Sequence, residues 1–238
     1  MKTTNKISVV IPAYNEEDWI QLPLESLEDQ NFDGSYEIVV VNNASTDDTK
    51  EIAKDFGVKV VDEPQKGYTR ACQTGFDAAK FPIIAVTDAD TIVSENWLAE
   101  IGKTLSKPDV IGAYGPITFH DAGGYLNWLA KYGFTAFLKM NSLLGKPHFD
   151  GFNMAVSKEA FEEVGGFNLS MKSASDVDLS QRLKKHGKIL YNKDMTVETS
   201  ARRLEDWGFK FFLHHAINYI NVVWLRRPEK ARDFDDIR

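Results

Sequence analysis

The chain has 238 residues, of which 43% are hydrophobic and 26% charged, and its formal net charge at pH 7 is −7. These values are typical of a globular protein with one substantial α/β core, or at most two small domains. The acidic balance argues against nucleic-acid binding, which needs a basic surface. The single cysteine, Cys72, excludes an intramolecular disulfide and suits a reducing compartment.

Targeting signals are not evident in the sequence. Residues 1–6 are polar and lack the apolar stretch of a signal peptide. No run of about 18 uncharged apolar residues predicts a membrane-spanning helix. We therefore expect a cytoplasmic protein.

Short apolar strands alternate with helix-compatible stretches through the first 90 residues. We predict strands over residues 7–11, 36–41, 58–61 and 83–87, separated by helices over 16–30, 45–56 and 68–79. This alternation favours βαβ units and a mostly parallel sheet flanked by helices. Ligands of such sheets bind at the carboxyl ends of the strands, so we expect Tyr14, Asn42 and Asp88 along one edge.

The remainder of the chain is less regular. We predict a strand over residues 149–156, a helix over 158–164, a helix over 176–186 and a strand over 189–192. Segments 125–144 and 207–225 combine aromatic and aliphatic residues with basic ones, and 226–238 is a charged tail. We divide the chain into residues 1–203, the α/β domain, and residues 204–238, an amphipathic helix with the tail.

Two carboxylates, Asp88 and Asp90, leave a predicted strand with only Ala89 between them. Hard divalent cations prefer such oxygen ligands and often keep waters and substrate phosphates as further ligands, so the triplet predicts a metal site. A solvated turn is the simpler alternative. Residues 88–91 also match the nucleophile motif of haloacid-dehalogenase-type phosphatases, in which Asp88 would be phosphorylated. That motif usually lies on the first strand, whereas three strand–helix units precede it here.

Seven segments, in their order and approximate spacing, resemble the motifs of family 2 glycosyltransferases. They are VIPAYNEE (10–17), VVVNNASTD (39–47), KGYTRA (66–71), DAD (88–90), GFNMAV (151–156), VGGF (164–167) and DVDL (176–179). The resemblance covers about residues 6–200. It implies a GT-A fold and an inverting, metal-dependent transfer of a sugar from a nucleoside-diphosphate sugar to an acceptor hydroxyl.

The resemblance also assigns roles to single residues. The nucleotide-binding positions would be Pro12, Ala13, Tyr14, Glu16, Asn42, Arg70, Asp88, Ala89 and Asp90. Within this set Asp88 would approach the ribose, and Asp90 would bind the Mg²⁺ or Mn²⁺ that neutralises the departing diphosphate. Asn42 stands where the family usually has Asp, and its amide can donate as well as accept. The resemblance implies a UDP-sugar as the favoured donor, and the Asn at position 42 makes a GDP-sugar the alternative.

Asp176 is the predicted general base, a role worth roughly 10²–10⁴-fold in rate. The family's base lies in an acidic pair that opens a helix, but here the pair is Ser175-Asp176, without the usual Glu. A helix N-cap is the alternative role for Asp176. Gly151, Asn153 and Asp178 are expected near the donor sugar or the acceptor.

The sequence allows more than one interpretation of the binding partners and of the cellular location. Arg202 and Arg203 follow a predicted strand and suit either phosphate contacts or the surface. Segment 207–225 suits either a membrane interface or packing on the sheet or a second subunit as a homodimer. The expected acceptor is a glycan or a lipid-linked molecule of cell envelope glycan biosynthesis, placing the enzyme at the inner face of the membrane. A nucleotide-sugar-binding protein without turnover is the alternative function.

Overall fold

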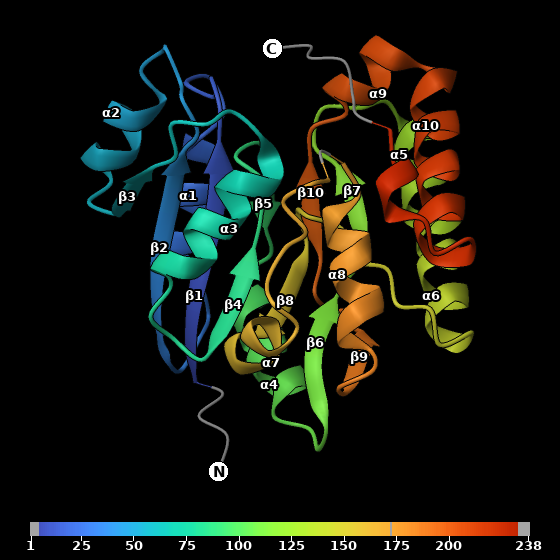
Figure 1. Ribbon diagram of the computed structural model, residues 1–238. Coiled ribbons are helices and arrows are strands. Elements are labelled where there is room, and N and C mark those ends of the chain that lie inside the picture. The colour runs from blue at the N-terminus through green and yellow to red at the C-terminus, as the bar shows by residue number, and fades with distance from the viewer. Residues whose placement is uncertain (1–4, 172, 233–238) are drawn as a thin grey trace.

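The computed structural model describes residues 5–171 and 173–232 of the chain (Figure 1). Its main sheet has seven strands in the order β3-β2-β1-β4-β8-β6-β9, and a smaller sheet has the order β5-β10-β7. The strands are β1 Lys6–Ala13, β2 Ser35–Asn42, β3 Lys59–Asp62, β4 Ile83–Val86, β5 Ile92–Val93, β6 Val110–Tyr114, β7 Ile117–Phe119, β8 Met154–Ser157, β9 Lys188–Tyr191 and β10 Val197–Thr199.

Helices connect these strands and follow the last of them. They are α1 Gln21–Glu28, α2 Thr49–Asp55, α3 Tyr68–Ala78, α4 Trp97–Leu105, α5 Gly124–Trp128, α6 Thr135–Leu143, α7 Lys158–Glu163, α8 Ser175–Leu183, α9 Arg202–Trp207 and α10 Phe209–Tyr219. Two π-helical turns, η1 Leu129–Phe134 and η2 Ile220–Trp224, extend α5 and α10, and η3 Pro228–Lys230 is a 3₁₀ turn. The mixed α/β architecture with a mostly parallel sheet agrees with the expected fold.

Both faces of the main sheet are covered, which explains why its central strands are almost wholly apolar. In β1, Val9 and Ile11 face the core that contains α1 and α4. Val10, between them, faces the core that contains α3, α7 and α8. Burial on both sides fixes the strand's position, because a shift of one residue would exchange the two faces.

One edge of the main sheet collects chain from several strands. β1 pairs in parallel with β2, where Ala13 lies opposite Asn42, and with β4, so the carboxyl ends of these strands lie side by side. β8 runs antiparallel to β4, and its first residue, Met154, pairs with Val86, the last residue of β4. The segment that enters β8 therefore reaches the same edge as the loops that leave β1, β2 and β4.

The boundaries of three predicted elements need correction. The helix predicted over residues 16–30 begins only at Gln21, after a turn in which the Glu16 carbonyl accepts from the Trp19 and Ile20 N–H groups. The helix predicted over 45–56 begins at Thr49, and the strand predicted over 149–156 begins at Met154. In each case the residues before the element form loops at the crowded sheet edge.

The C-terminal segment, residues 204–238, was predicted as one amphipathic helix with a charged tail, but it contains the end of α9 and then α10 with η2. Gly208, with φ of 50°, separates α9 from α10, and α9 spans the expected domain boundary. Val222 and Val223 of η2 pack against Val177 of α8, so this segment is joined to the α/β core. Tail residues 233–238 lie outside the described residues, and none of the described helices is both long and apolar enough to cross a membrane.

Candidate functional site

Asp90 lies after β4 and is held by residues more than one hundred positions downstream. Its carboxylate accepts hydrogen bonds from the Thr199 hydroxyl at 3.3 Å and from the Arg202 guanidinium at 2.8 Å. The His120 ring nitrogen lies 3.0 Å from its carbonyl oxygen. Only 6% of Asp90 is exposed. The predicted metal ligand is therefore a buried carboxylate with a fixed orientation.

Arg202 bridges Asp90 and Glu16. Its Nη2 atom lies 2.8 and 2.6 Å from the two carboxylate oxygens of Glu16 and 2.8 Å from Asp90 Oδ2. Burial disfavours the charged guanidinium, but the charges of Asp90 and Glu16 outweigh burial and raise the pKa of Arg202. One guanidinium thus pairs with two carboxylates at the position where a divalent cation was predicted. Arg202 is the member of the Arg202-Arg203 pair that reaches Asp90.

The residues predicted to bind the nucleotide base lie around the ends of β1 and β2. Tyr14 follows Pro12 and Ala13, and the Lys66 ammonium lies 3.8 Å from the centre of its ring. The Asn42 amide donates to Asp62 at 2.9 Å, while its oxygen accepts from the Ser45 N–H at 3.3 Å. The Asn42 side chain therefore already has a donor and an acceptor role within the protein.

Asn43, which was not among the predicted site residues, shapes the loop opposite Tyr14. Its amide donates to the carbonyls of Glu63 and Gln65 and accepts from the Gly67 N–H at 2.7 Å. Arg70 lies one turn into α3 beyond this loop. Hydrogen bonds from Thr74 and the Gln65 N–H, assisted by the Arg70 charge and opposed by burial, lower the pKa of Glu63. Arg70 is therefore close enough to this loop for its charge to act on Glu63.

Asp176, the predicted base, lies at the start of α8 and faces the loop before β8. Its Oδ2 accepts from the Gly151 N–H at 2.8 Å, and its Oδ1 accepts from the Val177 N–H at 2.8 Å. Burial and the neighbouring charge of Asp150 raise its pKa to about 6, against the opposing effects of His148 and the two N–H donors. At neutral pH this carboxylate is mostly ionised and has an unusually high proton affinity, as a general base requires.

Tyr68 lies close to both Asp88, which follows β4, and Asp176. Its hydroxyl is buried, and burial together with the charges of Asp88 and Asp176 raises its pKa well above the usual value. Its hydroxyl packs against Gly151, where a Cβ atom would collide with it. Gly151 is thus required by close packing, and it also contributes the N–H that orients Asp176.

Two predicted site residues have their polar groups engaged elsewhere. Asn153 is fully buried and binds the Trp97 indole N–H and the carbonyls of Pro116 and Met195. Asp178 accepts from the Arg182 Nε at 2.8 Å, one turn along α8.

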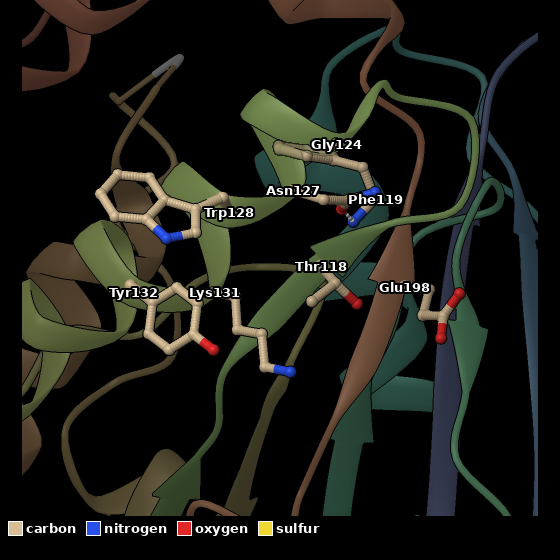
Figure 2. A pocket seen from close by; sticks show the side chains of 8 residues that line it. All are labelled: Thr118, Phe119, Gly124, Asn127, Trp128, Lys131, Tyr132 and Glu198. Carbon is tan, nitrogen blue, oxygen red and sulfur yellow. Dashed lines mark hydrogen bonds between the residues drawn. The ribbon is translucent and has the colours of Figure 1, made fainter.

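A pocket of about 410 Å³ lies elsewhere, between α5, η1 and the small sheet (Figure 2). It is lined by Thr118, Phe119, Gly124, Asn127, Trp128, Lys131, Tyr132 and Glu198. Successive residues of a strand face opposite sides. Glu198 faces this pocket, whereas its neighbour Thr199 contacts Asp90, so the pocket lies on the opposite side of β10 from Asp90.

The residues present suit a cation only if a substrate completes its coordination. Among the described residues, no cluster of three or more His, Cys, Asp or Glu side chains has the geometry of a metal site. Mg²⁺ and related cations are often bound by one or two carboxylates together with substrate phosphates and water. Asp90, with Asp88 two residues before it, fits that second arrangement.

Comparison with known sequences gives a consistent result. Residues 8–165 match the sequence model described as Glycosyl transferase family 2. The glycosyltransferase AglE of Haloferax volcanii is 30% identical over 186 residues, which cover 74% of this chain and 60% of that protein. An uncharacterized glycosyltransferase of Mycobacterium bovis is 36% identical over 129 residues, covering 53% of this chain and 55% of the relative. This chain thus spans little more than half the length of these relatives.

Solved structures share the fold. The mannosyltransferase PcManGT from Pyrobaculum calidifontis, solved with GDP-Man and Mn²⁺, matches with a TM-score of 0.75 at 21% identity, covering 96% of this chain and 65% of that one. Glucosyl-3-phosphoglycerate synthase from Mycobacterium tuberculosis, solved with Mn²⁺ and UDP, matches with a TM-score of 0.60 at 22% identity, covering 86% and 75%.

Proposed function

Because this chain belongs to glycosyl transferase family 2, we propose that it transfers a sugar from a nucleoside-diphosphate sugar to an acceptor hydroxyl. The family match separates this function from the phosphatase alternative, which the motif at Asp88 had left open. One observation supports the proposal most directly: acidic side chains from two parts of the chain lie at the same edge of the main sheet. Asp88 and Asp90 follow β4, and Asp176 faces the loop before β8, with Tyr68 close to both Asp88 and Asp176.

The donor nucleotide is proposed to bind over the ends of β1 and β2. Tyr14 supplies a face for base stacking, and Pro12, Ala13, Asn42 and Arg70 surround it. Asp88, next to Ala89, approaches the ribose. Glu16 takes a different role from the one expected of it, since both of its carboxylate oxygens bind Arg202. We assign Glu16 to the positioning of Arg202 beside the diphosphate.

Asp90 is the proposed ligand of Mg²⁺ or Mn²⁺. Such a cation supplies Lewis-acid stabilisation of the departing diphosphate. Arg202 donates a hydrogen bond to the Asp90 carboxylate. Its guanidinium therefore lies beside the proposed diphosphate site, where it can contact phosphate oxygens once the donor binds. The solved relatives with GDP-Man or UDP and Mn²⁺ support this use of the site in proteins of the same fold.

Asp176 is the proposed base of an inverting displacement. The acceptor hydroxyl gives its proton to Asp176 while its oxygen forms a bond to the anomeric carbon. The bond from that carbon to the diphosphate oxygen breaks, and its electron pair leaves with the nucleoside diphosphate. The Gly151 and Val177 N–H groups hold the carboxylate in place, and the raised pKa of Asp176, about 6, favours proton uptake.

A thermal-shift and turnover experiment tests this proposal. GDP-mannose and UDP-glucose are each added with and without Mn²⁺, and a ligand specific to the folded state raises Tm by mass action. We expect one donor to raise Tm only with Mn²⁺ and to be hydrolysed slowly. Asp176→Asn should keep the shift and lose turnover by at least about 10²-fold, whereas Asp90→Asn should lose the Mn²⁺-dependent part of the shift.

The outcomes separate the alternatives. A donor-dependent shift without turnover in the wild type identifies a nucleotide-sugar-binding protein. Full turnover in Asp176→Asn contradicts the base assignment. An equal shift with and without Mn²⁺ contradicts the metal assignment at Asp90.

A lipid-linked acceptor of cell envelope glycan biosynthesis is proposed from a surface that we call the basic–apolar patch. It is formed by Leu143, Leu144, Lys146, Lys184, Trp224, Leu225 and Arg226. The Lys146 ammonium lies over the Trp224 ring, which joins the residues after α6 to η2. Lys184, directly after α8, donates to the Gly145 carbonyl. The four apolar side chains are 52–88% exposed. On a chain with net charge −7, such a basic and apolar surface complements an anionic bilayer.

A further inference from the structure

A buried ion pair lies next to Asp176. His148 and Asp150, in the loop before β8, are each 8% exposed, and His148 Nε2 lies 3.4 Å from Asp150 Oδ1. The second polar atom of each side chain is also buried. These atoms, His148 Nδ1 and Asp150 Oδ2, have no hydrogen-bond partner among the described residues. Buried polar atoms usually find a partner, so this arrangement calls for a functional explanation.

The ion pair is joined to Asp176 through the backbone. Asp150 directly precedes Gly151, whose N–H binds the Asp176 carboxylate. Position 175, where related enzymes usually carry a second acid, holds a buried Ser175 that accepts from the Thr69 hydroxyl at 2.9 Å. A second carboxylate therefore stands beside the base, but it comes from the loop before β8.

His148 is held in place from its other side. Its ring lies 5.3 Å from the Phe137 ring and 5.5 Å from the Tyr219 ring, measured between centroids. His215 of α10 also lies near it, and burial together with the charges of His214, His148 and Arg203 lowers the pKa of His215 to about 4. His148 is the histidine whose charge lowers the pKa of Asp176, against burial and Asp150, which raise it.

We propose that His148 and Asp150 are positioning residues that set the proton affinity of Asp176 in opposite directions. The proposal rests on the function proposed above for Asp176. Asp150 places a negative charge beside the base, which favours the protonated form. The His148 imidazolium favours the ionised form, so that the base is available before the acceptor binds.

The groups around Asp176 are consistent with these opposite effects of Asp150 and His148. Burial works against a charge on His148, but Asp150 and then Asp176 outweigh it and raise the pKa of His148. From α3, the Tyr68 and Cys72 side chains face Asp176, and burial raises the pKa of both, so both are neutral. Asp88 lies beyond Tyr68. The two charges that act on the pKa of Asp176 are those of Asp150, which raises it, and His148, which lowers it.

Histidine NMR tests the coupling without any substrate. The chain has five histidines, and the Cε1–H signal of His148 is assigned by its loss in His148→Gln. We expect the titration midpoint of His148 to move to lower pH in Asp150→Asn and, by a smaller amount, in Asp176→Asn. Glu163→Gln, which removes a carboxylate 3.0 Å from His186 Nδ1, is the matched control variant and should leave the His148 midpoint unchanged. An unchanged His148 midpoint in both aspartate variants overturns the proposal.

The pH dependence of turnover supplies the second readout, with Mn²⁺ and whichever of GDP-mannose and UDP-glucose the wild type hydrolyses. The acid limb should lie near pH 6, the pKa of Asp176. It should move to lower pH in Asp150→Asn and to higher pH in His148→Gln, with donor affinity at pH 8 unchanged. A purely structural role predicts lower activity in both variants with no opposite displacement, and that result overturns the proposal. Turnover in Asp176→Asn, with the NMR coupling intact, instead refutes the base assignment alone.

Discussion

Arg202 changes the interpretation of two other residues. From the sequence, Asp90 was a metal ligand and Glu16 a contact of the base, whereas the structure joins both to one guanidinium. Like charges on one carboxylate repel, so a divalent cation and Arg202 compete for Asp90 Oδ2. The sequence could not reveal this competition, because Arg202 is 112 positions from Asp90 and 186 from Glu16.

Removal of Arg202 should therefore weaken the fold and strengthen the response to a cation. Breaking a fully buried pair from one side costs about 3–5 kcal/mol, and the 26% exposure of the Arg202 side chain reduces the expected loss below that range. Arg202→Ala should unfold at a lower temperature than the wild type. Mn²⁺ without nucleotide should raise its Tm by more than it raises that of the wild type.

Arg202→Lys is the control, since it keeps the charge. It should lie between the two proteins in Tm and in its response to Mn²⁺. Equal Tm values for Arg202→Ala and the wild type, with equal responses to Mn²⁺, would show that the two carboxylates do not depend on this cation.

At the scale of elements, Asn153 joins parts of the two sheets. Its side chain binds Trp97 of α4, the Pro116 carbonyl between β6 and β7, and the Met195 carbonyl before β10. Trp97 is itself fully buried. A residue predicted from motif resemblance to contact sugar thus fastens the small sheet, which carries Thr199, to the main one.

Asn153→Ala should consequently lower stability. It leaves the Trp97 N–H and two carbonyls without this partner, and a buried polar group left unsatisfied costs roughly 1–3 kcal/mol. Urea denaturation measures the loss. Asn31→Ala, which removes an exposed hydrogen bond to Asn96, should change stability by less than about 0.5 kcal/mol. If Asn153→Ala keeps its stability and loses donor affinity, the sugar contact predicted from the sequence is correct.

The elements that the sequence predicted well are those whose pattern is local. β1 and β4 are buried along almost their whole length, and β2 is buried over its second half. β1 runs through Pro12 to Ala13, two residues beyond its predicted end. The start of α2 was wrong because distant contacts set it. The Asn15 amide oxygen binds the Thr46 N–H, and the Glu17 carboxylate binds the Asp48 N–H, so residues 45–48 form a loop.

The site was predictable to a similar extent. Residues directly after parallel strands, such as Tyr14 and Asp88, were located by the rule for strand ends. His148 and Asp150 were missed because nothing local shows that β8 runs antiparallel beside β4. Residues 92–119 received no prediction. They contain a two-residue β5 and a three-residue β7, which are too short to show a period.

For the whole molecule, the basic–apolar patch is the feature that bears on location. Partial burial and the charge of Arg226 lower the pKa of Lys146. Burial and the charges of Lys146, Arg226 and Lys185 do the same for Lys184. These basic groups are therefore close enough to repel one another. A surface of anionic lipid headgroups relieves that repulsion, because it supplies counter-charges.

Vesicle co-sedimentation tests this contact. The protein should sediment with vesicles that contain phosphatidylglycerol and should remain in solution with phosphatidylcholine alone. The variant with Lys146, Lys184 and Arg226 all changed to Glu should lose binding. The matched control changes Lys54, Lys80 and Lys103, which are exposed on other parts of the surface, to Glu and alters the net charge equally. Equal sedimentation of the two variants contradicts a membrane role for the patch, and concentration-dependent dimerisation through it would identify a second subunit as its partner.

The antiparallel direction of β8 has a consequence for how such a protein diversifies. Chain leaves the working edge of the sheet after β1, β2 and β4, but it arrives there before β8, through residues 120–153 (Figure 1). Surface connections tolerate changes of length far better than strands do. The exposed turns of this incoming connection, at Gly123 and Gly145, can therefore change length without altering the register of the three outgoing strands. In this architecture the proposed nucleotide site follows the outgoing strands, whereas Gly151, which binds the Asp176 carboxylate, arrives with the incoming connection, so the two lie on separate pieces of chain.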